Sequence, residues 1–203
     1  MRKVFLIIVL LVSSISHSRA MTKMEMEQQL LSIQVLRAQY QQTRHAAGLE
    51  ASLESSGRLV LAREVGLAWV QTEPFSAEFV FTDEAVFETF PGKSKKVRLR
   101  SEHAEIFKIV SMITTFLEGD TSFLEKTFTM AFTEETDNRW SLVLTPRIGR
   151  IKKLFASITL KGNMFIESME INETGGNRSI IEFFDQATTP TTLSIDESHY
   201  FQN

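Results

Sequence analysis

The chain has 203 residues, of which 22 are Lys or Arg and 25 are Asp or Glu, and it has no cysteine. The lack of cysteine excludes disulfide bonds, thiolate metal sites and the lipid-modified cysteine that anchors bacterial lipoproteins. The formal net charge of -3 argues against nucleic acid as a partner, because nucleic-acid-binding domains are usually basic.

Residues 1–20 have the pattern of a secretory signal peptide, with MRK, the apolar run FLIIVLLV and then SSISHSRA. We expect cleavage after Ala20. The alternative, a membrane anchor that stays attached, requires a longer apolar run than these eight residues. Without the three basic residues of this segment, residues 21–203 have a formal charge of -6 and are long enough to form one domain with its own core.

The first elements after the signal peptide are a helix and two strands. Polar and apolar residues from Thr22 to Ile33 predict a short helix, and alternation from Leu36 to about His45 is typical of a strand. The small and polar residues 46–56 predict a loop. The stretch GRLVLAREVGLAWVQ, residues 57–71, predicts one long strand with a single apolar row that an arginine interrupts: Leu59, Leu61, Arg63, Val65, Leu67 and Trp69.

Residues 75–90 predict a hairpin, because the apolar runs FSAEFVF and AVFETF are separated by TDE. The basic stretch GKSKKVRLR, residues 92–100, is either a solvated strand edge or loop beside a helix, or a patch for phosphate or lipid headgroups. The following segment predicts the clearest helix of the chain, with apolar residues at helical spacing: Ile106, Ile109, Val110, Ile113 and Leu117.

From Phe128 onward the period returns to two, and turn-forming clusters separate short runs, which predicts an antiparallel meander. Ser194 and Glu197 form a capping-box pattern that predicts a terminal helix from about Ile195. The predicted fold class is α+β, a strongly curved antiparallel sheet with helices against one face.

No pattern typical of an enzyme or a metal site is present. His45, His103 and His199 stand alone, and the motifs of zinc proteases, serine hydrolases and phosphate-binding loops are absent. We therefore expect no catalysis, no cofactor and no metal. Fifteen of the sixteen phenylalanines follow the signal peptide, and many fall on predicted strands, which fits either an ordinary core or an apolar binding surface.

The stretch GRLVLAREVGLAWVQTEPFSAEFVFTDEAVFE, preceded by LRAQYQQTRH and followed by RWSLVLTPRIGRIKKLFASITLKGNMFIESMEI, resembles the periplasmic outer-membrane lipoprotein carrier family (LolA-like). The resemblance extends from the first helix to about Phe184. It implies an unclosed antiparallel β-barrel in which helices form a lid over the concave face. Glu64 departs from the family pattern, which often has proline after the arginine, and the chain end also differs.

By this resemblance Arg63 matches an arginine that bonds to the lid and holds it shut when the protein is empty. Backbone carbonyls of a facing helix or loop would satisfy its guanidinium. The other interpretation is a bulge at Val65 and Gly66 that turns Arg63 to solvent. The residues expected to line the cargo site are apolar and come from the predicted strands and the long helix: Leu59, Leu61, Leu67, Trp69, Phe79, Phe81, Ile106, Ile109, Ile113, Phe128, Met130, Phe132 and Leu142.

The resemblance further implies a periplasmic carrier for the acyl chains of a lipoprotein or another lipid. Its expected partners are that cargo, an ATP-driven release complex of the inner membrane and an acceptor at the outer membrane, with transient membrane-protein contacts, and a monomer is expected. Two other functions stay open at this point. One is a periplasmic sensor or adaptor that binds lipid or peptide without transport, and the other is an enzyme that acts on lipid.

Overall fold

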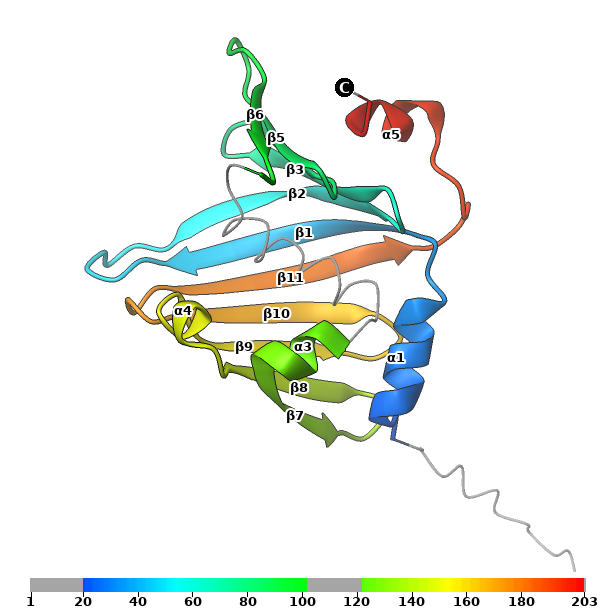
Figure 1. Ribbon diagram of the computed structural model, residues 1–203, viewed down its shortest axis with the longest axis vertical. Coiled ribbons are helices and arrows are strands. Elements are labelled where there is room, and N and C mark those ends of the chain that lie inside the picture. The colour runs from blue at the N-terminus through cyan, green and yellow to red at the C-terminus, as the bar shows by residue number, and fades with distance from the viewer. Residues whose placement is uncertain (1–19, 102–121, 203) are drawn as a thin grey trace, which may run out of the picture.

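The computed structural model describes residues 20–101 and 122–202, which form one open, eleven-stranded antiparallel sheet (Figure 1). The strand order is β6-β5-β4-β3-β2-β1-β11-β10-β9-β8-β7, so β6 and β7 are free edges and the sheet does not close. The strands are β1 Val35–His45, β2 Leu53–Ala62, β3 Gly66–Glu73, β4 Ala77–Phe81, β5 Ala85–Thr89, β6 Lys96–Leu99, β7 Phe128–Glu134, β8 Trp140–Pro146, β9 Phe155–Gly162, β10 Ile166–Glu173 and β11 Arg178–Ala187.

Two meanders build this sheet. The strands β1 to β6 form one half and β7 to β11 the other, and the first strand of one half pairs with the last strand of the other. The predicted open antiparallel sheet is therefore confirmed. The basic stretch lies in β6, the free edge of the first half, as one of its two interpretations predicted.

The described helices are short: α1 Lys23–Leu31, α3 Ser122–Thr127, α4 Gly149–Lys152 and α5 Ile195–Tyr200. The predicted capping box of Ser194 with Glu197 is present before α5, and a second one, Thr22 with Glu25, begins α1 near the residue where a helix was predicted to start. The predicted signal peptide, apart from Ala20, and the predicted helix around Ile106 to Leu117 lie outside the described residues. Within residues 20–101 and 122–202, no helix is both long and apolar enough to cross a membrane.

The long strand predicted over residues 57–71 is wrong, because the segment is a hairpin. It turns at Arg63 to Val65, where the Val65 amide donates to the Ala62 carbonyl at 3.0 Å. Glu64 has a positive φ of 63°, and Gly66 has a φ of 147° at a place where a Cβ would lie 2.2 Å from the Phe81 carbonyl oxygen. The predicted loop over residues 46–56 is also shorter, since β2 begins at Leu53.

Each face of the sheet carries its own buried cluster. The inner cluster joins strands of both halves with α1 and α3, and it contains Met26, Leu30, Ile33, Leu36, Ala38, Tyr40, Leu59, Leu61, Leu67, Leu124, Phe128, Trp140, Leu142, Leu144, Ile158, Leu160, Ile166, Met169, Ile181 and Phe183. The outer cluster lies on the opposite face of the first half and contains Val35, Val60, Ala62, Ala68, Val80, Ala85 and Phe87, with Leu193, Tyr200 and Phe201 packed against it. Helices against only one face were predicted, but α5 packs on the outer cluster.

Candidate functional site

The strand registers place ten predicted lining residues on the inner face. In the first half, Leu61 lies opposite Leu67 and Leu67 opposite Phe81, while Leu59, Trp69 and Phe79 form the next row. In the second half, Phe132 lies opposite Leu142, and Met130 and Phe128 follow on the same side of β7. The other three, Ile106, Ile109 and Ile113, lie outside the described residues.

Burial divides this face into a covered centre and more open flanks. Leu59, Leu61 and Leu67 are each 2% exposed, and Leu142 is fully buried. Met26 and Leu30 of α1 and Leu124 of α3 belong to the same packed cluster, so these helices cover part of the centre. The partly buried members lie toward the sides: Trp69, Phe79, Phe81, Met130 and Phe132.

Within the described residues, the Tyr40 hydroxyl oxygen is the one fully buried side-chain polar atom of the inner cluster for which no hydrogen-bond partner is found. Its ring lies against Trp69 with centroids 4.1 Å apart, and Trp69 in turn meets Phe183 edge to face at 6.2 Å. Burial raises the pKa of Tyr40 to about 12, which keeps the hydroxyl neutral. A buried hydroxyl in this position is a hydrogen-bonding group surrounded by apolar surface.

Arg63 lies in the β2–β3 turn and bonds to the end of α1. Its Nε donates to the Ile33 carbonyl and its Nη2 to the Leu30 carbonyl, both at 2.9 Å, and its backbone amide donates to the Gln34 carbonyl at 2.9 Å. The last carbonyls of a helix lack partners within the helix and carry partial negative charge. Because α1 has no basic residue in its own last turn, Arg63 supplies the cation there.

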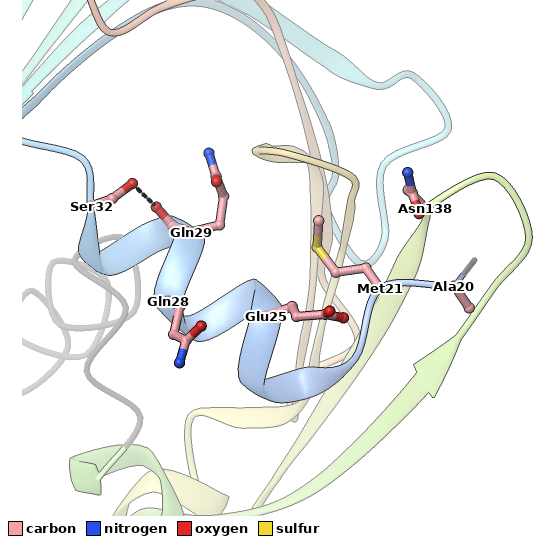
Figure 2. Close-up of a pocket in the computed structure, with 7 residues that line it drawn as sticks. All are labelled: Ala20, Met21, Glu25, Gln28, Gln29, Ser32 and Asn138. Carbon is pink, nitrogen blue, oxygen red and sulfur yellow. Dashed lines mark hydrogen bonds between the residues drawn. The ribbon is translucent and has the colours of Figure 1, made fainter. Parts of the chain in front are cut away.

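A pocket of about 420 Å³ lies beside α1 (Figure 2), and its lining is mainly polar: Ala20, Met21, Glu25, Gln28, Gln29, Ser32 and Asn138. The Ser32 hydroxyl donates to the Gln29 carbonyl at 2.6 Å, and the Thr22 amide donates to the Glu25 carboxylate at 2.9 Å. None of the predicted lining residues borders this pocket. It is therefore distinct from the apolar inner face.

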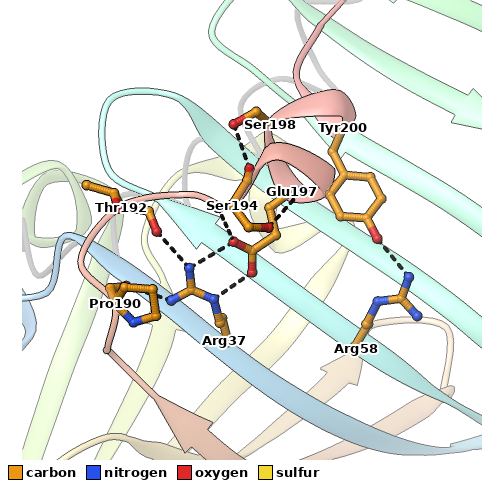
Figure 3. Close-up of polar contacts among 8 residues, drawn as sticks. All are labelled: Arg37, Arg58, Pro190, Thr192, Ser194, Glu197, Ser198 and Tyr200. Atoms are coloured by element: carbon orange, nitrogen blue, oxygen red, sulfur yellow. Dashed lines mark hydrogen bonds and ion pairs between the residues drawn. The ribbon is translucent and has the colours of Figure 1, made fainter.

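The C-terminal segment, residues 188–202, is attached to the outer face by polar contacts (Figure 3). Arg37 on β1 donates from Nε and Nη2 to the Glu197 carboxylate at 2.5 and 2.8 Å, and to the carbonyls of Pro190 and Thr192 at 2.8 and 2.9 Å. These bonds lower the pKa of Glu197 to about 2. Arg58 on β2 donates to the Tyr200 hydroxyl at 2.7 Å.

This attachment was not predicted from the sequence. The apolar outward residues Val35, Val60 and Ala62 could have indicated a covered outer face, since they alternate with the inner row on strands that otherwise expose polar groups. Their partner segment is about 160 residues away, and no local pattern identifies it.

Metal chemistry has no support in the described part of the chain, where no three His, Asp or Glu side chains gather closely enough to hold an ion. The features available for binding are therefore the apolar inner face, the buried Tyr40 hydroxyl and the bonds from Arg63 to α1. Such a surface favours ligands with hydrocarbon chains.

The sequence matches one protein family, the outer membrane lipoprotein carrier protein LolA, over residues 31–195, which are 165 of the 203 residues. The chain belongs to the LolA family. Proteins of the LolA family are carriers or binding proteins of the cell envelope rather than enzymes. Most of α1 precedes the matched range, and most of α5 follows it. A comparison with curated proteins finds no match.

Among solved structures, a DUF1329-family protein from Desulfovibrio piger has 12% identity and a TM-score of 0.50, with 89% of this chain and 94% of that chain covered. A LolA-superfamily protein from Nitrosomonas europaea has 11% identity, a TM-score of 0.46 and coverage of 91% and 99%. A chain of the Pseudomonas aeruginosa MucA/MucB complex has 12% identity and a TM-score of 0.48, with 86% of this chain and 59% of that chain covered. At such identities the first of these likenesses supports the LolA-like fold and nothing finer.

Proposed function

We propose that this LolA-family protein is a periplasmic carrier that shields the acyl chains of a lipoprotein or another lipid and moves it from the inner toward the outer membrane. The observation that carries the proposal is the apolar inner face, which is continuous across both halves of an open sheet in a chain of this family. Acyl chains would bind against the partly buried flanks and replace the covering helix α1 over the centre.

Arg63 has the role of a gate in this proposal, and α1 is the part of the lid that it holds. Two charge-assisted hydrogen bonds contribute roughly 1.5–3 kcal/mol each. Burial of a methylene contributes about 0.8 kcal/mol, so roughly four to eight methylenes offset the loss of both bonds. Displacement of α1 also exposes Met26 and Leu30, at roughly 1.5–3 kcal/mol each, so about 8 to 15 methylenes offset the whole cost. One long acyl chain is therefore sufficient to displace α1, and the bonds re-form when the chain leaves.

Release sets a limit on how completely the cargo is buried. Full burial of several long chains at about 0.8 kcal/mol per methylene would exceed any affinity that permits release. Shielding is therefore partial. Loading from a membrane requires an energy source, and delivery requires a partner that binds the cargo more strongly. We propose an ATP-driven inner-membrane release complex and an outer-membrane acceptor for these two steps.

The test compares two neighbouring positions on the edge strand β7. Met130 is partly buried on the inner face, whereas Ala131 is exposed on the outer face. Transfer of a fluorescent acylated lipoprotein to acceptor vesicles is measured for Met130→Glu and for Ala131→Glu, which have the same added charge. We expect at least a tenfold loss of cargo binding and transfer for Met130→Glu only, because a carboxylate among acyl chains is poorly solvated.

Equal behaviour of the two variants would place the cargo elsewhere and overturn the proposal. A third result, in which the unmodified protein binds the lipoprotein but does not accelerate its transfer, would favour the sensor or adaptor over the carrier.

A further inference from the structure

The hairpin formed by β5 and β6 ends in an unusually basic tip. Residues 90–100 contain five basic residues and no acidic one, so this segment has a charge of +5, and the remainder of residues 21–203, from a total of -6, has a charge of -11. The hairpin projects beyond the rest of the sheet, and β6 is a free edge (Figure 1). The projecting hairpin is therefore positive, whereas the remainder of the chain has a negative net charge.

Two of the five cations have partners close to the base of the hairpin. Arg98 donates to the Glu88 carboxylate at 2.6 Å, and Arg100 donates to the Asp83 carbonyl at 3.1 Å. The other three are Lys93, Lys95 and Lys96, all exposed, and none of them forms an ion pair with any described residue. These three lysines are the unneutralised charge of the tip.

The three lysines border one pocket of about 600 Å³, together with Glu88, Phe90 and Ser94. Its only carboxylate, Glu88, already binds Arg98. Two lysines lie over aromatic rings, Lys93 5.7 Å from the centroid of Phe90 and Lys95 4.5 Å from that of Phe87. The pocket thus combines ammonium groups, a hydroxyl and an aromatic ring, which is a suitable environment for a phosphate group that enters from an apolar–water boundary.

We propose that the β5–β6 tip docks on the surface of a bilayer that contains anionic phospholipid, with a headgroup phosphate among Lys93, Lys95 and Lys96. The tip of one hairpin offers far less area than a stable protein–protein interface of about 1,200 Å² or more requires, whereas headgroups can surround it from every side. The charge of -11 on the remainder of residues 21–203 is repelled by the same surface. Binding is therefore oriented, with the tip toward the membrane.

The tip is also connected to the inner face. Phe90 packs edge to face on Phe79 with centroids 5.9 Å apart, and Phe79 lies opposite Trp69 in the β3–β4 register. A lipid headgroup held at the tip would thus lie at the end of an aromatic row that leads to the inner cluster. Docking itself does not require the carrier role, since it is measured without cargo.

The experiment measures binding of the protein without its signal peptide to large vesicles by co-sedimentation. One set of vesicles is pure phosphatidylcholine, and the other contains about one third phosphatidylglycerol. We expect binding only to the second set and a large loss between about 50 and 500 mM salt, where screening shortens electrostatic interactions. Each lysine near such a surface contributes about a fivefold factor, so Lys93→Ala/Lys95→Ala/Lys96→Ala should bind roughly a hundredfold more weakly.

The matched control is Lys126→Ala/Lys152→Ala/Lys153→Ala, which removes the same charge from exposed lysines elsewhere. It should bind as the unmodified protein does. Equal weakening in both triple variants, or equal binding to the two kinds of vesicle, would overturn the proposal. So would binding of inorganic phosphate or soluble polyglutamate at the tip without binding to anionic vesicles, because the site would then serve a free anion or an acidic protein. Cargo transfer is measured separately, so either idea can fail alone.

Discussion

The inner and outer clusters of the sheet are covered in different ways. On the inner face, α1 packs on a wide apolar surface, and the polar bonds from the sheet to its last turn come from Arg63 to the carbonyls of Leu30 and Ile33. On the outer face, the C-terminal segment covers a smaller cluster and is held through Arg37 by a carboxylate and two carbonyls.

This difference means that another apolar group can replace α1 on the inner face, whereas the C-terminal segment stays attached to the outer face. Apolar contacts are not directional, so hydrocarbon chains can take the place of α1 on the inner face at little cost. The paired charges of Arg37 and Glu197 have no such substitute, and either charge alone would be left partly buried. The inner face is therefore suited to exchange, and the outer face to permanent attachment.

The largest effect is expected from removal of the outer attachment. Arg37→Ala loses four hydrogen bonds to the C-terminal segment and should lower the free energy of unfolding by about 4 kcal/mol. Urea denaturation measures this loss, and limited chymotrypsin digestion should cut after Tyr200 or Phe201 earlier than in the unmodified protein. Arg58→Ala loses one bond and is expected to cost about 1 kcal/mol. Equal effects of the two changes would show that Arg37 does not fix the segment.

Local signals in the sequence predicted local structure well. Ser194 and Glu197 predicted the start of α5, because a capping box is complete within four residues, and the polar and apolar pattern after Thr22 predicted the start of α1. The β2–β3 hairpin was missed for an equally physical reason. Leu61 and Leu67 pair across the turn and are six positions apart, so the alternation of the two strands continues through the turn unchanged.

Contacts between residues far apart in the chain could not be predicted from local sequence patterns. The pairing of Arg37 with Glu197 depends on which outward residues of β1 meet a segment about 160 positions later. Arg63 was predicted in the middle of a strand, whereas it lies in a turn, and its acceptors are the carbonyls of Leu30 in α1 and of Ile33 just after it. The apolar strand residues share one face because alternation in strands is local, whereas the predicted covering helix, Ile106 to Leu117, lies outside the described residues.

The second prediction weakens the inner cover. Arg63→Leu removes the two side-chain bonds to the Leu30 and Ile33 carbonyls and should destabilise the empty, covered state by about 3 kcal/mol, the lower end for two charge-assisted bonds. A bound lipid then competes with a weaker cover, so its affinity should rise by roughly tenfold or more and its release to acceptor vesicles should slow. Release of a fluorescent acylated peptide measures this, with Arg58→Leu on the outer face as control. Unchanged release from Arg63→Leu would mean that Arg63 holds α1 for stability alone.

The third prediction uses pH to test the outer attachment. Arg37 holds the pKa of Glu197 at about 2, below the ordinary value of 4.5, so the attachment is complete at neutral pH. Its contribution should be lost as the pH falls from about 5 to 2, by about 1–2 kcal/mol after solvent screening is considered. Glu197→Gln should be less stable at pH 7 and lack this part of the acid dependence. An unchanged acid profile in that variant would assign the dependence to other carboxylates.

The smallest change concerns Tyr40, whose buried hydroxyl has no partner among the described residues. Removal of an unpaired buried polar group is stabilising, so Tyr40→Phe should raise the free energy of unfolding of the empty protein by about 1 kcal/mol. An acyl chain carries an ester or amide carbonyl at its end, and the Tyr40 hydroxyl is a hydrogen-bond donor for such a carbonyl. The same variant should then bind an acylated peptide several times more weakly while it binds a plain hydrocarbon equally well. Weaker binding of both ligands would indicate altered packing around Trp69, whose ring centroid lies 4.1 Å from that of Tyr40. An unchanged free energy of unfolding would mean that the Tyr40 hydroxyl already has a hydrogen-bond partner in the empty protein.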